Sequence, residues 1–192
     1  SVDELVALDP ITGTSLGVRE SSSRLPDASP AGAEALAELS RRTLVRLAEA
    51  ERLPGADNDV ERRCARLLRE RLTASLAVHE ADEGLRAVSN LHSPAHAVRQ
   101  VFTVTPAQSE EDWAAIAERL RAVPAALEGY RDSLSLGLER KLYGGPRATA
   151  TFVEQLGQWA DADGADGAGP GRFGRYRSRG AVAAPCGRVA AC

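Results

Sequence analysis

The sequence predicts an all-α protein, a multi-helix bundle of long antiparallel helices followed by an irregular C-terminal tail. Apolar residues make up 43% of the chain and are mostly Ala and Leu, whereas aromatic residues make up only 4%. Ala and Leu favour helix, while β-branched and aromatic residues favour strands. Apolar residues also recur every three or four positions along most of the chain, which is the spacing of one helix face.

Composition divides the chain into two parts. We expect a helical domain over residues 1–160, and a chain of this size can bury roughly 70% of its unfolded surface. Residues 161–192 form a low-complexity linker and an Arg-rich tail. This segment is either a natural basic tail or the product of GC-rich DNA read out of frame. Lys141 is the only lysine in the chain, and this Arg bias indicates a high-GC bacterial genome.

Charge and hydropathy exclude several classes of partner. The net charge is −3 and the tail is basic, so the helical part is acidic and lacks the basic face that nucleic acids require. No apolar run approaches the roughly 20 residues that span a bilayer, so we expect a soluble, cytoplasmic protein.

Three cysteines form an odd set without metal-binding spacing. Cys64 lies on an apolar stripe, where we expect it to be buried.

The first 55 residues predict a short helix, a loop and a long helix. Residues 2–8 should form a helix. It should end at Asp9-Pro10, because the residue before a proline avoids the α region. Residues 11–28 are rich in Gly, Ser and Thr and predict a structured loop. Ser29-Pro30 begins the next helix, which ends near 53–55. Its core stripe is expected to contain Leu36, Leu39, Thr43, Leu44 and Leu47.

A second long helix follows, capped by Asp57 or Asn58 and running to Val88 without interruption. Its apolar residues are spaced by four, so the stripe that they form drifts around the helix. Such a helix should contact different neighbours at its two ends, as in a scaffold helix of a larger helical body. The stripe consists of Val60, Cys64, Leu68, Leu72 and Leu76.

The remaining helices are marked by strong start signals. Ser93-Pro94 begins a short helix to about Phe102. A capping box from Ser109 to Asp112 begins a longer helix, in which Pro124 either introduces a kink or starts a new helix. The apolar stripe of this region contains Trp113, Ile116, Leu120, Val123, Leu127, Tyr130, Leu134, Leu138 and Leu142. Gly144-Gly145 should end it, and Pro146 should begin the last helix, with Phe152, Val153, Leu156 and Trp159 on one face.

Several short sequence segments within residues 1–160 resemble, in the same order, the amino-terminal part of the bacterial family called domain of unknown function 885. The matching segments are Val2 to Pro10, Arg69 to Leu72 leading to His79-Glu80, Ser93-Pro94, Arg99 to Phe102, Glu111 to Trp113, Arg119 to Pro124, and Tyr130-Arg131. The resemblance implies a mainly helical, zincin-like metallopeptidase fold. Members are longer and carry a histidine-rich zinc motif in their carboxy-terminal half, to which nothing in this chain corresponds.

Histidines are the first candidates for chemistry. A zincin helix needs two histidines one turn apart with a glutamate between them, but after His79-Glu80 the second ligand position is occupied by Glu83. His79 and Glu80 are therefore interpreted as surface or packing residues. His92 and His96 have metal-binding spacing, yet Pro94 separates them at a helix start. We expect no metal site and no cofactor in this chain, and zinc would belong to a partner subunit.

Four residues are candidates for substrate binding. Arg99 and Gln100 belong to one of the segments that resemble the family. An arginine can bind carboxylate, sulfate or phosphate through two parallel hydrogen bonds. The alternative is a structural Arg that bonds helix-end carbonyls. His96 lies one turn earlier in the chain. Tyr130 lies on an apolar stripe, a position more typical of a core residue than of a catalytic one.

The leading hypothesis is a non-catalytic helical subunit of a split metallopeptidase-like enzyme. It would form one wall of a substrate cleft, and a separately encoded partner would supply the metal or acid–base groups for a proteolytic or biosynthetic reaction. The alternative is a stand-alone helical binding module or an inactive truncated fragment. A third hypothesis, an enzyme that is complete in itself, predicts turnover without a partner.

Overall fold

The computed structural model describes residues 2–52 and 58–161, and the predicted tail over 162–192 lies outside them. The described part contains helices and no strands, which confirms the all-α prediction. The elements are α1 (Val2–Leu8), α2 (Pro10–Ser15), the 3₁₀ helix η1 (Arg19–Ser21), α3 (Pro30–Ala50), α4 (Asp59–Glu80), the 3₁₀ helix η2 (Glu83–Arg86), α5 (Pro94–Val104), α6 (Glu110–Glu139) and α7 (Pro146–Asp161). None of these helices is both long and apolar enough to span a bilayer.

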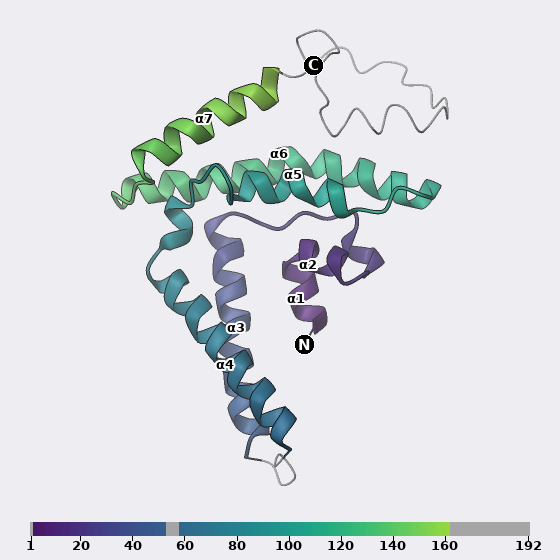
Figure 1. The fold of residues 1–192 in the computed structure, drawn as a ribbon, viewed down its shortest axis with the longest axis vertical. Helices are drawn as coiled ribbons and strands as arrows, with labels where there is room; N and C mark the ends of the chain where they lie inside the picture. The colour runs from purple at the N-terminus through teal and green to yellow at the C-terminus, as the bar shows by residue number, and fades with distance from the viewer. Residues whose placement is uncertain (1, 53–57, 162–192) are drawn as a thin grey trace. The chain divides into compact units, whose positions relative to one another are not determined.

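The chain divides into two compact units, Ser1–Thr149 and Ala150–Cys192. Within the first unit, α3 and α4 form a hairpin, and α5 lies along α6 (Figure 1). The N-terminal helices α1 and α2 contact α3 and α5, respectively. Helix α7 runs from the first unit into the second, and the predicted domain boundary at residue 160 falls near its end.

The predicted helix starts are confirmed by their caps. Ser29 Oγ accepts the N–H of Gly32 at 3.2 Å, and Asn58 caps α4 through Val60. Ser109 and Asp112 form the expected capping box at the start of α6. Backbone N–H groups, first that of Gln108, hold the pKa of Asp112 below its ordinary value, because they stabilise the carboxylate form.

Two predictions near the N-terminus and in the second hairpin helix are wrong. Residues 10–15 are helical instead of looped, since Pro10 occupies the first position of α2 and Asp9 caps it through the N–H and hydroxyl of Thr12. The helix predicted to reach Val88 ends at Glu80, because Asp82 adopts a left-handed conformation with φ 55°. Aspartate tolerates this conformation better than most residues do, and the chain then turns into η2.

Helix α6 is continuous through Pro124, so no new helix starts there. It also ends earlier than Gly144-Gly145, the predicted stop. Lys141 takes the left-handed position with φ 60°, where its N–H bonds Leu138 O and the next N–H bonds Gly137 O. This is a Schellman motif with lysine in the place usually held by glycine.

The predicted stripes agree only partly with the buried faces. Leu39, Ile116 and Tyr130 are buried, but Leu127 and Leu138 are exposed. Cys64 is exposed, which contradicts its predicted burial, and α4 has no buried residue at all. The buried face of α6 instead carries mostly small and polar residues, which allow neighbouring backbone to approach closely. This face consists of Ile116, Arg119, Ala126, Tyr130, Ser133 and Gly137.

Arg119 holds the N-terminal segment to the rest of the first unit. Its side chain has 0% exposure and donates to four oxygens from three parts of the chain. Nε bonds Arg24 O at 3.0 Å, Nη1 bonds Thr105 Oγ1 at 2.5 Å, and Nη2 bonds Thr14 Oγ1 at 2.8 Å and Ser21 O at 2.5 Å. Burial lowers the pKa of Arg119 to about 10, so the guanidinium remains charged at neutral pH.

Beside Arg119 lies the apolar core between α5 and α6. Val101 and Phe102 of α5 pack against Ile116 of α6, and Ile11 and Leu25 of the N-terminal segment cover this cluster. The buried guanidinium and the apolar cluster therefore join the same three segments. Loss of the guanidinium hydrogen bonds should therefore weaken the packing of the apolar cluster, and loss of that packing should weaken the hydrogen bonds.

Replacement of Arg119 by Met should destabilise the protein by about 3–5 kcal/mol, because four buried oxygens lose their donor. Arg119→Lys should recover part of this loss, since an ammonium cannot reproduce the guanidinium fork. Urea unfolding measures the effect. The control is Arg121→Met, whose exposed side chain forms a surface ion pair with Glu118. Equal losses for Arg119→Met and Arg121→Met would contradict the assigned role.

Lys141→Gly should stabilise the protein by about 0.5–1 kcal/mol, because glycine adopts the left-handed conformation without the steric cost that a side chain incurs. Lys141→Ala keeps the Cβ and should give no gain. Thermal unfolding of both variants distinguishes conformational strain from the loss of the lysine charge. The assignment fails if alanine stabilises as much as glycine.

Candidate functional site

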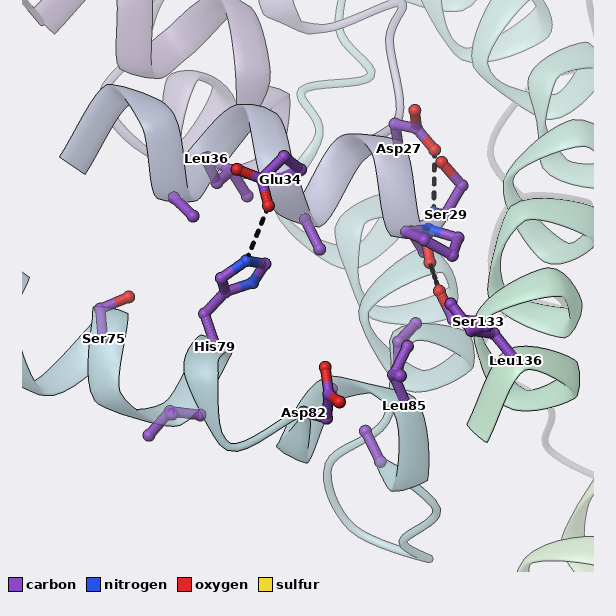
Figure 2. Close-up of a pocket in the computed structure, with 18 of the residues that line it drawn as sticks. Asp27, Ser29, Glu34, Leu36, Ser75, His79, Asp82, Leu85, Ser133 and Leu136 are labelled. Carbon is purple, nitrogen blue, oxygen red and sulfur yellow. Dashed lines mark hydrogen bonds and ion pairs between the residues drawn. The ribbon is translucent and has the colours of Figure 1, made fainter. Parts of the chain in front are cut away.

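A cavity of about 480 Å³ lies between α3, α4, η2 and α6. This volume is in the usual range of small-molecule sites. Figure 2 shows how side chains from these elements converge on it. The lining residues are Asp27, Ala28, Ser29, Pro30, Ala33, Glu34, Leu36, Ala37, Ser75, Val78, His79, Asp82, Gly84, Leu85, Ala87, Pro94, Ser133, Leu136 and Arg140.

Apolar side chains form a large part of the lining. Ala33 and Ala37 come from α3, Leu85 from η2 and Leu136 from α6. The backbone of η2 can lie this close to α6 because residue 137 is glycine, where a Cβ would stand 2.2 Å from Leu85 O. These residues give the cavity a surface suited to an apolar group.

Hydrogen bonds fix the start of α3 against α6 at one end of the cavity. Buried Ser133 donates from Oγ to Ala28 O at 2.7 Å, and Asp27 Oδ1 accepts the N–H of Ser29 at 2.9 Å (Figure 2). Because the start of a helix carries partial positive charge, the Asp27 carboxylate is favourably placed there. This end of the cavity is therefore preformed.

An acid–base pair bridges α3 and α4 at another edge of the cavity. Glu34 Oε2 lies 3.0 Å from His79 Nε2, and the two side chains point toward each other in Figure 2. Arg41 also donates to Glu34, at 2.7 Å. Arg41 first, and His79 second, hold the pKa of Glu34 below its ordinary value. Glu34 is therefore ionised at neutral pH, with the Arg41 guanidinium as its counter-charge.

An ion pair joins the ends of α4 and α6. Arg140 Nη1 donates to Asp82 Oδ2 at 2.6 Å. Asp82 is the left-handed residue after α4, and Arg140 directly precedes Lys141, the left-handed residue after α6. The two helix ends thus place a carboxylate and a guanidinium on the cavity wall.

The comparisons with known proteins identify the family of the chain. The sequence model of a family described as "Bacterial protein of unknown function (DUF885)" matches residues 10–185, which is most of the chain. The chain belongs to the DUF885 family. A search of curated proteins finds no match.

None of the four predicted substrate-binding residues of this DUF885 chain lines the cavity. Tyr130 is buried beside it, and its hydroxyl donates to Ala87 O at 2.8 Å. His96 is half-buried, with Nδ1 2.8 Å from Ser93 Oγ. Arg99 and Gln100 lie together on the exposed face of α5. Three of these residues therefore share α5, and Tyr130 contacts the cavity wall only through its hydrogen bond to Ala87.

Sequence reasoning missed the polar groups that do line the cavity. Glu34 and His79 are 45 positions apart, and Asp82 and Arg140 are 58 positions apart, so no local motif connects them. The sequence predicts a surface or packing role for His79, and its contact with Glu34 joins two helices. A useful signal was available for Asp82, because an aspartate directly after the last helical turn is a frequent left-handed residue.

The polar groups that line the cavity are not arranged as a zinc site. Within residues 2–52 and 58–161 no three His, Cys, Asp or Glu side chains are grouped as a metal site would require. Glu34 and His79 already pair with each other, and Glu34 also accepts a hydrogen bond from Arg41. The arrangement instead suits recognition of a ligand with an apolar group and a polar flank.

Replacement of Tyr130 by Phe should cost about 1 kcal/mol of stability, because Ala87 O loses its donor. Burial is the main reason that the pKa of Tyr130 lies above its ordinary value of 10.0, so the folded state disfavours the phenolate. This contribution is present below pH 10 and is lost as the pH rises further, when the unfolded chain deprotonates first.

The stability of the wild type should therefore fall more steeply above pH 10 than that of Tyr130→Phe, as measured by denaturant unfolding at several pH values. Tyr143→Phe, at an exposed position, is the control. Unchanged stability of Tyr130→Phe combined with weaker ligand binding would instead support the predicted substrate contact.

Proposed function

We propose that this helical region forms one wall of the substrate cleft of a metallopeptidase-like enzyme, and that a separately encoded polypeptide supplies the metal and acid–base groups. The observation that carries the proposal is the preformed cavity between α3, α4, η2 and α6 in a DUF885 chain. Its reaction is proteolytic or biosynthetic, on a peptide or a peptide-like substrate.

The lining of the cavity supports a ligand of this kind. Ala33, Ala37 and Leu136 offer space for an apolar side chain, while the hydrogen-bonded pair Glu34–His79 and the ion pair Asp82–Arg140 lie around it. A peptide presents this combination of an apolar side chain and flanking polar backbone groups. Because both pairs are formed within the chain, the ligand meets a wall that is already ordered.

The exposed face of α5 extends this proposal. Arg99 and Gln100 are accessible there, one turn after His96. An arginine at such a position can bind a carboxylate through two parallel hydrogen bonds. We assign these residues to a second contact with the substrate or with the partner polypeptide, separate from the cavity.

Exposed apolar side chains on α6 support a partner. Trp113, Leu120 and Leu127 follow one another at seven-residue intervals and are exposed. Seven residues are close to two helical turns, so the three side chains lie on one face. Exposed apolar surface of this kind often marks a protein–protein contact.

A stand-alone binding module is the second candidate. It is favoured by the hydrogen bonds that shape the cavity, because those of Ser133, Tyr130 and Arg140 all lie within this chain. Such a module would bind its ligand without a partner and would catalyse no reaction.

The test compares two variants of α3. Ala33→Phe should fill the cavity, whereas Ala31→Phe is on the same helix at an exposed position outside it. The tagged chain is purified from its own bacterium, and the assembly is analysed for zinc and for hydrolysis of peptides. Zinc should follow a second polypeptide, and a chelator should abolish turnover until zinc is restored.

Ala33→Phe should lower kcat/KM at least about tenfold without changing the zinc content, and Ala31→Phe should leave both unchanged. Purification of the chain with no second polypeptide, together with ligand binding that Ala33→Phe abolishes, would favour the binding module. Equal turnover and equal ligand binding of the two variants would contradict the role of the cavity in either function.

A further inference from the structure

Helix α4 carries a second apolar face beside the one that packs against α3. At its ends Cys64 borders a pocket that Leu47 and Ala50 of α3 also line, and Val78 borders the cavity. The residues of this second face follow alternating four- and three-residue steps, the spacing of a coiled-coil seam. We call this face the outer seam. It consists of Val60, Cys64, Leu67, Arg71, Ala74 and Val78.

The outer seam is exposed along its whole length. Val60 is 59% exposed, Leu67 58% and Val78 54%. Cys64, Arg71 and Ala74 are also exposed, whereas Leu72 and Leu76 on the opposite side of the helix are half-buried. Of the described elements, α4 packs mainly against α3 and η2, which leaves the outer seam without a covering helix.

We propose that the outer seam binds the outer seam of a second copy of this chain in antiparallel orientation. Two α3/α4 hairpins then form a four-helix bundle. Val60 to Val78 span about 27 Å of helix, so the seam provides six successive contact positions. The inference concerns a different face of α4 from the one that lines the cavity, apart from Val78, and it does not rest on the proposed function.

Charge decides between the two possible orientations. In a parallel pair Arg71 would face the second copy's Arg71, and the like charges would repel. In the antiparallel pair centred on the seam, Arg71 faces the second copy's Leu67, and its aliphatic stem can cover that side chain. A single polar residue within an apolar seam is a known determinant of orientation and register.

The flank of the seam shows the same complementarity. Arg63 and Glu70 are seven residues apart and lie on the same side of the outer seam. The antiparallel pair brings Arg63 toward the second copy's Glu70, and the two-fold axis repeats the pair. In a parallel pair the residue opposite Arg63 would be Leu68, which offers no charge partner.

The arrangement of the first unit leaves room for this assembly. The α3/α4 hairpin extends away from α5 and α6 (Figure 1). Antiparallel pairing therefore places the α5/α6 layers of the two copies at opposite ends of the bundle. Parallel pairing would bring both layers to the same end.

The first experiment measures the dimer dissociation constant of the full chain by sedimentation. Leu67→Glu should raise this constant at least about tenfold, or about 1.4 kcal/mol. Thr73→Glu introduces the same charge at an exposed position off the seam and should leave the constant unchanged. Because Leu67 is mostly exposed, the variant should keep the helical circular dichroism of the wild type.

The second experiment tests orientation by disulfide formation in a Cys186→Ser, Cys192→Ser background. The antiparallel register pairs Cys64 with the second copy's residue 74, so Ala74→Cys should give a covalent dimer on mild oxidation, and Thr73→Cys should not. A monomer at every concentration overturns the proposal and leaves the seam to a helix of another protein. Equal cross-linking of the two cysteine variants, or equal weakening by the two glutamates, overturns it as well.

Discussion

The buried guanidinium of Arg119 is the constraint on which the first unit depends. It bonds oxygens before, within and after the N-terminal 3₁₀ helix, and it reaches Thr105 at the end of α5. A charge without exposure is tolerated only when its donors are satisfied. The N-terminal segment, α5 and α6 must therefore assemble together. Removal of the N-terminal segment would take away three of the four acceptors, and removal of α5 would take away the fourth.

Helix α6 transmits this order to the cavity. The face that buries Arg119 also carries Tyr130, Ser133 and Gly137, which meet Ala87, Ala28 and Leu85, respectively. Each of these contacts positions a different segment of the cavity wall. Small and polar residues on α6 allow the backbone of η2 and the start of α3 to lie directly against the helix. A face of large apolar residues would have held those segments further away.

The sequence was sufficient for the class of fold and for most helix starts, because caps and prolines act locally. Ser29, Asn58, Ser93 and Ser109 illustrate this, since each bonds a backbone group two or three residues away. The cavity could not be predicted, because its polar pairs join residues far apart in the chain. The spacing of leucines was also misleading on α6. Its buried face is partly polar, so periodicity indicated the helix but not the side that packs.

The central claim is that the cavity between α3, α4, η2 and α6 contacts the substrate. Hydrogen–deuterium exchange on the purified assembly, with and without a hydrolysis-resistant peptide that carries an apolar side chain, tests it most directly. When this ligand is bound, slower exchange is expected in the segments 30–37, 79–87 and 133–140. Unchanged exchange in these three segments, with protection elsewhere in the chain, would contradict it.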